Sequence, residues 1–269
     1  VDHLEERYPD FDGLNLSFET REGILKHCSQ AHARQIEARE PAGVAQRFLL
    51  RQQPSLEAQL CNLADEIAYN AHDIDDGVRS GLISLAQLQD VALFDDYRRA
   101  ALAEHPHLQA SDQGRRLLYE SIRRMLSAQI YDVIDATQVA LRQAAPADVD
   151  AVRRLPPLVQ FGHAMREQSR ALKAFLLQQL YRHPQVVRTN DHARQVVRDL
   201  FAAYISAPHD MPERYQRRWA QAAQDSPPAD PHSARARVVA DYIAGMTDRF
   251  AAREHQRLTG LQLLSQANP

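Results

Sequence analysis

Two long stretches with the periodicity of an amphipathic helix constrain the fold of this chain more than any other feature. In residues 55–77, apolar side chains recur at helical spacing from Leu56 to Ile74, directly after a Pro-Ser pair that is typical of a helix start. Residues 112–143 show the same periodicity from Leu118 to Ile134. Glycine is scarce, at 9 of 269 residues, and alternating Val, Ile, Thr and Tyr runs are nearly absent. These patterns predict an all-α protein.

The other segments predict further helices. Ser17 is placed to cap a helix that runs to about residue 33, with Ile24 and Leu25 on its inner face. Short helices are expected near 84–90 and 91–104, and longer ones within 161–183, from about 189 to 206 and from about 233 to 258. Because the apolar faces continue across each joint, we expect one helical domain over residues 1–269, a multi-helix bundle with a C-terminal helical extension.

Composition narrows the class of protein. No run approaches the roughly 18 apolar residues that span a bilayer, and the charged start lacks the features of a secretory signal. Two cysteines, Cys28 and Cys61, make no disulfide framework, which favours a reducing cytoplasm. A net charge of −3 argues against general or strong nucleic-acid binding. Lys26 and Lys173 are the only lysines, so nearly all cations are arginines, which fits a GC-rich genome or phosphate recognition.

A stripe of polar side chains marks the 55–77 helix. At helical spacing, one face carries Asn62, Asp65, Tyr69, His72, Asp73 and Asp76. An ordinary solvated acidic face is one interpretation. The alternative is a site, since no Lys or Arg intervenes and Asp65 is flanked by Ala and Leu residues that imply partial burial. A half-buried carboxylate needs an Arg or a metal ion as partner.

The 112–143 helix offers a possible complement to these acids. Arg115, Tyr119 and Arg123 repeat at i, i+4 and i+8, so they share one face. These residues favour two interpretations equally. Either they form ion pairs with the acidic helix, or they supply the cations of an anion pocket whose metal-binding carboxylate comes from that helix.

Four stretches of the sequence resemble a known family. They are ETREGILKH (19–27), SLEAQLCNLADEIAYNAHDIDDGVRSGLI (55–83), LKAFLLQQLYRHPQVVR (172–188) and DYIAGMTDRF (241–250). Over essentially its whole length, the chain resembles the bacterial deoxyguanosinetriphosphate triphosphohydrolase-like branch of the HD-domain phosphohydrolases. The resemblance implies an HD-domain-type helical bundle, a homo-oligomer without membrane association, and hydrolysis of a deoxynucleoside triphosphate (dNTP) to the deoxynucleoside and inorganic triphosphate.

The resemblance also implies roles for individual residues. The family uses a divalent metal such as Mg²⁺ or Mn²⁺, and its distant aspartate ligand corresponds to Asp65. Tyr69 is then expected at the triphosphate and Asp73 at the 3′-hydroxyl of the deoxyribose. By a similar spacing on the next helix, Arg115 is expected to contact a phosphate, with Tyr119 and Arg123 lining the site.

The other metal ligands of the family are a histidine and an adjacent His-Asp pair, which lie upstream of the segment that begins this chain. The dipeptide His72-Asp73 does not correspond to that pair. The start at Val1 therefore leads us to expect that an N-terminal segment is missing, that this chain holds one metal ligand of four and no further catalytic residue, and that it is inactive alone. Two alternatives stay open: an inactive dNTP-sensing or oligomerisation module, and an HD phosphohydrolase for another nucleotide.

Overall fold

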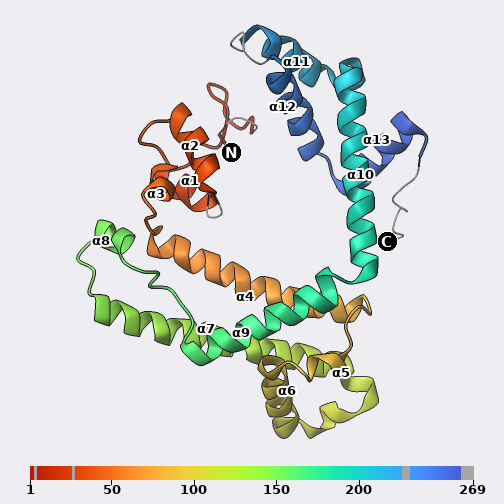
Figure 1. Cartoon of the computed structure of the whole chain (residues 1–269). Coiled ribbons are helices and arrows are strands. Elements are labelled where there is room, and N and C mark those ends of the chain that lie inside the picture. Colours follow the sequence, from red (N-terminus) through yellow and green to blue (C-terminus); the bar gives the residue numbers. More distant parts are fainter. Residues whose placement is uncertain (3–4, 26–27, 226–230, 262–269) are drawn as a thin grey trace. The chain divides into compact units, whose positions relative to one another are not determined.

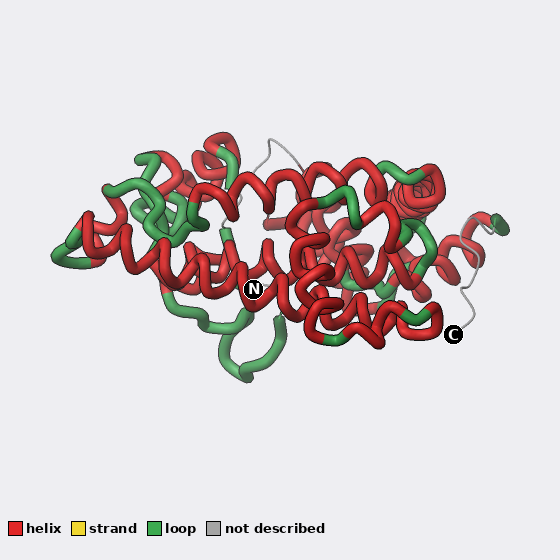
Figure 2. Tube along the Cα trace, turned by 90° about the horizontal axis from the view of Figure 1, so that it is seen from below, coloured by secondary structure: helices red, strands yellow, loops and turns green. Residues whose placement is uncertain are grey.

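A computed structural model of the chain describes residues 1–2, 5–25, 28–225 and 231–261. In these residues the backbone forms α-helices, three short 3-10 helices and one π-helical turn, and it forms no β-strand (Figures 1 and 2). The predicted all-α fold class is confirmed. The α-helices are α1 (Phe18–Ile24), α2 (Gln30–Arg39), α3 (Gln46–Leu49), α4 (Leu56–Arg79), α5 (Leu85–Leu88), α6 (Ala92–Glu104), α7 (Gly114–Ala144), α8 (Val149–Arg154), α9 (His163–Leu176), α10 (Pro184–Ser206), α11 (Glu213–Asp225), α12 (Pro231–Ala244) and α13 (Asp248–Thr259).

The chain divides into two compact units. We call Val1–Arg182 the N-terminal unit and His183–Pro269 the C-terminal unit. The N-terminal unit holds α1 to α9 and the π turn η3 (Leu177–Tyr181), and the C-terminal unit holds α10 to α13. The single domain expected over residues 1–269 stays a prediction. Across the described ranges, no helix is both long enough and apolar enough to cross a lipid bilayer.

The core of the N-terminal unit forms where α4, α6, α7 and α9 pack together. Its fully buried side chains include Ile74, Phe94, Met125 and Leu172, one from each of these helices. A polar contact lies within this core, because Gln129 of α7 donates a hydrogen bond to Ser169 of α9 at 3.2 Å. These contacts fix the distance between α4 and α9, which carry the site described below.

The predicted helix at 55–77 is confirmed as α4, and its start is the expected one. Ser55 Oγ accepts a hydrogen bond from the amide of Ala58 at 3.3 Å. The helix runs past Gly77, which does not end it. A side chain at this buried glycine would have its Cβ 2.7 Å from Ile83 Cδ1. Gly77 therefore allows close packing of the chain that follows α4.

The first predicted helix is wrong in length. Ser17 caps α1 through a 3.3 Å hydrogen bond from the amide of Thr20, as expected. However, α1 ends at Ile24 and α2 starts after Ser29, whose hydroxyl caps it in the same way. Ile24, expected on an inner face, is 51% exposed. The last two residues of the matching stretch 19–27 lie outside the described residues.

The last predicted helix is also two helices. The chain leaves the helical conformation after Ala244, and Thr247 Oγ1 accepts a hydrogen bond from the amide of Phe250 at 3.3 Å to begin α13. On α7, the expected inward positions Ile130 and Ile134 are 48% and 43% exposed. The spacing of apolar residues along a helix gives the angle between their side chains, but it does not give how much of the helix surface neighbouring helices cover.

A buried ion-pair cluster joins α1, α3 and α8. The Glu22 side chain is 2% exposed and accepts a hydrogen bond from Arg153 Nη1 at 2.7 Å. Arg47 Nε lies 3.5 Å from the same carboxylate, and its side chain is 7% exposed. Burial lowers the pKa of Arg47, while the Glu22 charge opposes that shift. One carboxylate therefore compensates two buried cations.

The core of the C-terminal unit is rich in tyrosine. Tyr204 and Tyr242 meet edge to face at 5.1 Å between ring centroids, and Tyr215 lies 4.6 Å from Tyr242. These rings pack with Val196 and Leu200 of α10 and with apolar residues of α12. The stacked rings bring α10, α11 and α12 together.

Candidate functional site

The polar stripe lies along the middle of α4. Asp65 and Tyr69 are exposed, and Asp73 is partly buried. The expectation that Asp65 is half-buried is wrong, because Ala64 and Ala68 beside it are themselves exposed. The stripe thus faces away from the core formed by the same helix.

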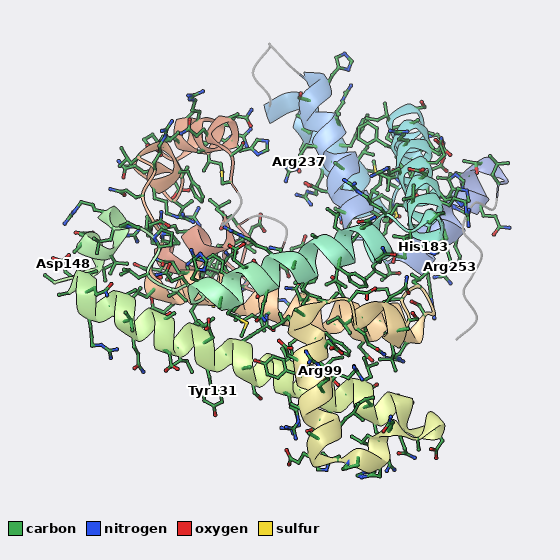
Figure 3. All side chains as sticks on the ribbon, turned by 60° about the horizontal axis from the view of Figure 1, so that its bottom comes forward. Arg99, Tyr131, Asp148, His183, Arg237 and Arg253 are labelled. Carbon is green, nitrogen blue, oxygen red and sulfur yellow. The ribbon has the colours of Figure 1, made fainter. Side chains whose placement is uncertain are left out.

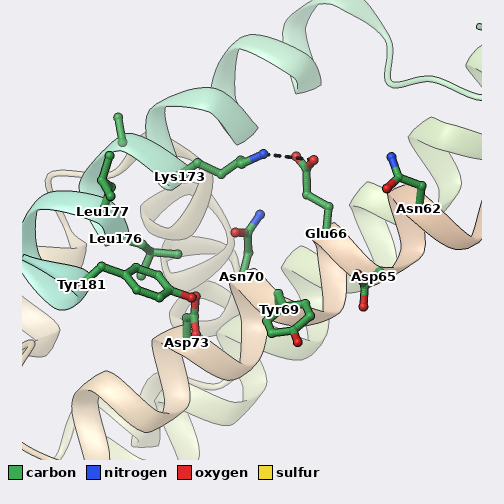
Figure 4. A pocket seen from close by; sticks show the side chains of 11 residues that line it. Asn62, Asp65, Glu66, Tyr69, Asn70, Asp73, Lys173, Leu176, Leu177 and Tyr181 are labelled. Atoms are coloured by element: carbon green, nitrogen blue, oxygen red, sulfur yellow. Dashed lines mark hydrogen bonds and ion pairs between the residues drawn. The ribbon is translucent and has the colours of Figure 1, made fainter. Parts of the chain in front are cut away.

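A cavity of about 520 Å³ lies between this stripe and the segment formed by α9 and η3. It brings together three of the predicted site residues, Asp65, Tyr69 and Asp73 (Figure 4). Its lining residues are Asn62, Asp65, Glu66, Tyr69, Asn70, Asp73, Lys173, Ala174, Leu176, Leu177 and Tyr181. One wall is therefore acidic and the other carries a cation and an aromatic hydroxyl.

Lys173 is the one cation among the described residues that line this cavity. Its Nζ lies 3.0 Å from Glu66 Oε2, which joins α9 to α4 across the cavity (Figure 4). The Lys173 side chain is 50% exposed and that of Glu66 is 30% exposed. An ion pair of this exposure contributes about 0–1 kcal/mol, so Lys173 can exchange Glu66 for a stronger anion at little cost.

Tyr181 and Asp73 make a second contact across the cavity. The Tyr181 hydroxyl donates a hydrogen bond to Asp73 Oδ2 at 2.6 Å. This bond, together with partial burial, raises the pKa of Tyr181 to about 12. Tyr181 ends the π turn η3, a wider turn that is frequent at functional sites. Asp73 is thus held in one orientation with its other oxygen available to a ligand.

Asn70 supplies a buried donor beside these groups. Its side chain is 6% exposed, and its Nδ2 has no hydrogen-bond partner among the described residues. Figure 4 shows this amide on the face of α4 that carries Glu66 and faces α9. Leaving a buried amide unsatisfied costs about 1–3 kcal/mol, so the group is placed to donate to an oxygen that enters the cavity.

The three predicted residues of α7 lie elsewhere. Arg115, Tyr119 and Arg123 are exposed and do not line the cavity. Arg115 Nη2 lies 3.4 Å from the Tyr119 hydroxyl, and Arg123 pairs with Glu120 at 2.6 Å. Among the described ion pairs, none joins these arginines to the carboxylates of α4. Their phosphate-binding roles stay a prediction.

The described residues do not make a metal centre on their own. Among them, no group of three or more His, Cys, Asp or Glu side chains gathers where it could hold an ion. In the cavity, Glu66 contacts Lys173 and Asp73 contacts Tyr181, while His72 is not a lining residue. A divalent cation needs several ligands at defined positions, so Asp65 provides at most one of them.

The residues of the opposite wall were not found by sequence reasoning. Lys173 and Tyr181 are eight positions apart in the stretch 172–188, which resembles the family, but their spacing was not used. Residues eight positions apart lie about 80° apart around a regular α-helix, so the spacing of Lys173 and Tyr181 gave no local signal of a shared wall. Asn70 gave no signal, because its burial depends on packing against α9.

Comparisons with known proteins show which proteins this chain is similar to. A model of the phosphohydrolase-associated domain family matches residues 159–257. The chain is 50% identical over 264 residues, 98% of its length, to the deoxyguanosinetriphosphate triphosphohydrolase-like protein of Ralstonia nicotianae. It is 51% identical over 258 residues to the protein of that description in Bordetella pertussis, and 46% identical over 262 residues to that in Thiobacillus denitrificans. The chain covers 63%, 62% and 64% of the length of these relatives, respectively.

Proposed function

We propose that the whole protein hydrolyses deoxynucleoside triphosphates to the deoxynucleoside and inorganic triphosphate. The reason is that this chain is homologous to the C-terminal part of deoxyguanosinetriphosphate triphosphohydrolase-like proteins, which belong to the HD-domain phosphohydrolases. The proposal includes a divalent metal, Mg²⁺ or Mn²⁺, a cytoplasmic location and a homo-oligomer. One observation carries it. The cavity between α4 and α9 combines the acids predicted from the family resemblance with a lysine that was not predicted.

The cavity suits a nucleotide in size and chemistry. Its volume of about 520 Å³ lies within the range of small-molecule sites. Lys173 offers up to three N–H donors to phosphate oxygens once it leaves Glu66. The buried Asn70 amide offers a further donor, and the 60% exposed ring of Tyr69 offers an aromatic surface. We assign the triphosphate to the Lys173 end of this set.

Asp73 suits the sugar in this proposal. Its Oδ2 already accepts from Tyr181, so the carboxylate is oriented before a ligand arrives. The remaining oxygen can accept a hydrogen bond from a 3′-hydroxyl. A substrate that lacks this hydroxyl would leave the carboxylate with one interaction fewer.

Asp65 is proposed as a metal ligand, with the other ligands in the portion of the relatives that this chain does not span. The 269-residue chain should therefore bind a divalent ion weakly and should not hydrolyse dNTPs alone. A second candidate function is a dNTP-sensing or oligomerisation module without hydrolysis. The same assay distinguishes the two functions.

The test uses the full-length protein with Mn²⁺ or Mg²⁺ and a panel of dNTPs, ribonucleotides and monophosphates, with the products identified. We expect triphosphate release from a dNTP and its loss in Asp65→Ala. Lys173→Gln should lower kcat/KM by about 10- to 100-fold, the value of one or two charge-assisted hydrogen bonds. Arg170→Gln is the matched control, because Arg170 is on the same helix and pairs with Glu167 outside the cavity.

The outcomes separate the alternatives. Release of pyrophosphate or single phosphates would contradict the proposed reaction. Binding without product would support the sensing module, and turnover only of another nucleotide would support a different HD phosphohydrolase. The Arg123→Gln variant tests whether α7 or α9 supplies the phosphate contact. A larger loss of kcat/KM in that variant than in Lys173→Gln would favour α7.

A further inference from the structure

The C-terminal unit contains a second cavity, of about 440 Å³, where α11, α12 and α13 meet. Its walls include Arg214, Tyr215, Tyr242, Gly245, Phe250 and Arg253. Figure 3 labels Arg253 of α13 and Arg237 of α12, both in the C-terminal unit. None of these residues takes part in the site between α4 and α9.

Of the residues that the structure describes, two arginines are the only charged ones that line this cavity. Within the described residues, neither Arg214 nor Arg253 forms an ion pair with a carboxylate. Each lies near an aromatic ring instead, with the Arg214 guanidinium 4.8 Å from the Tyr215 centroid and that of Arg253 6.0 Å from that of Phe250. A guanidinium that faces a ring still has N–H donors that can bind an anion.

The carboxylates that could neutralise these arginines have other partners or do not line the cavity. Glu254, next to Arg253, accepts from Arg257 at 2.8 Å. Asp241 accepts from Arg237 at 2.7 Å. Asp210 lies 3.8 Å from Arg257, and Glu213 and Asp248 are exposed. The Arg253 charge helps to lower the pKa of Glu254, but none of these carboxylates lines the cavity, so the charges of its described lining residues are positive.

The tyrosines give the cavity a rigid wall with hydroxyl groups. The side chains of Tyr215 and Tyr242 are 9% and 7% exposed and pack against each other. Arg214 Nη2 lies 3.4 Å from the Tyr215 hydroxyl. Burial raises the pKa of Tyr242, so this phenol stays neutral and can donate a hydrogen bond. Two cations and phenolic hydroxyls in one cavity match the oxygens of a phosphoryl group.

We propose that the cavity between α11 and α13 binds a phosphate group, either as inorganic phosphate or as part of a nucleotide. Arg forks form charge-assisted, often bidentate hydrogen bonds to phosphate oxygens, which are stronger than those between neutral groups. The two guanidiniums come from two helices, so one phosphate can join α11 to α13. This inference does not depend on the function proposed for the other cavity.

The test is calorimetric titration of the full chain with inorganic phosphate and, separately, with deoxyguanosine monophosphate. The chain carries Lys173→Gln, so that the first cavity contributes little. We expect saturable binding that Arg214→Gln/Arg253→Gln weakens by at least about tenfold. The matched control is Arg217→Gln/Arg249→Gln, which removes two exposed arginines from the same helices outside the cavity. It should change affinity by no more than about twofold.

Two results would overturn the proposal. One is that neither probe binds saturably up to about 10 mM, and the other is that both double variants lose affinity equally. Tighter binding of the nucleotide than of inorganic phosphate identifies a nucleotide as the source, and equal binding identifies the phosphate alone. Circular dichroism confirms folding of each variant. The single variants Arg214→Gln and Arg253→Gln are each expected to weaken binding, so the test stands if the double variant fails to fold.

Discussion

Replacing Glu22 by Gln should destabilise the N-terminal unit strongly. The substitution keeps the size of the side chain but removes the one carboxylate among the described residues that contacts Arg47 and Arg153, whose side chains are 7% and 14% exposed. Breaking a buried ion pair from one side costs about 3–5 kcal/mol, because the partner charge stays buried without compensation. Since the Gln oxygen can still accept one hydrogen bond, we expect about 3 kcal/mol.

Glu120 provides a comparison of the same type in a more exposed position. Its carboxylate, in a side chain 18% exposed, also contacts two arginines at 2.6 Å, and these are Arg123, 65% exposed, and Arg124, 20% exposed. Glu120→Gln should therefore cost no more than about 1 kcal/mol. The contrast between the two variants isolates the effect of burial from that of ion-pair number.

Urea unfolding followed by far-UV circular dichroism measures both variants. Trp219, the single tryptophan, is in α11, so its fluorescence follows the C-terminal unit. Adding Arg47→Met to Glu22→Gln should restore at least about 1 kcal/mol, because it removes one of the uncompensated cations. Similar costs for the Glu22 and Glu120 variants, or no recovery with Arg47→Met, would refute the reasoning.

Three further predictions follow from local geometry. Gly77→Ala should lower the free energy of unfolding in urea by about 1–2 kcal/mol. Its Cβ would lie 2.7 Å from Ile83 Cδ1, and this overpacking costs more than the higher helix propensity of Ala contributes. The control Gly114→Ala, whose Cβ would lie 3.6 Å from Leu85 Cδ1, should be neutral or stabilising. Ser55→Ala should cost about 1 kcal/mol by removing the cap of α4, and an unchanged midpoint would contradict that role. Tyr181 should ionise near pH 12 in an NMR titration and nearer its ordinary pKa of 10.0 in Asp73→Asn. Because the folded state keeps this proton longer than the unfolded state, the contribution of Tyr181 to stability is complete below pH 10.0 and is lost as pH rises towards about 12.

The parts of the fold that were predictable depend on local interactions. Ser17 and Ser55 cap their helices by contacts three residues along the chain, and the apolar spacing of 55–77 covers nearly all of α4. Ser29 and Thr247 make the same contact, so the two missed helix breaks also had a local signal. Their caps lie within runs of helix-forming residues, and those runs dominated the prediction.

The second wall of the candidate site depends on tertiary packing. Asp65, Tyr69 and Asp73 share one helix, so their spacing alone placed them together. Lys173 meets Glu66 across 107 positions of the sequence and Tyr181 meets Asp73 across 108, and no local pattern reports such contacts. Arg115 and Arg123 of α7 have the spacing of a shared face, but they do not line the cavity.

The π turn at Leu177–Tyr181 makes the site sensitive to the length of the chain. Its hydrogen bonds close over one residue more than those of an α-helix, so the turn takes up one extra residue and keeps Tyr181 on the side of Lys173. Deleting one residue would convert it to an ordinary turn and leave that relation unchanged, whereas adding one would rotate Tyr181 by about 100° around the helix axis, away from Asp73. A single codon insertion would thus separate the two contacts across the cavity without changing either residue. In related sequences, the number of residues between this lysine and this tyrosine is therefore as informative as their identities.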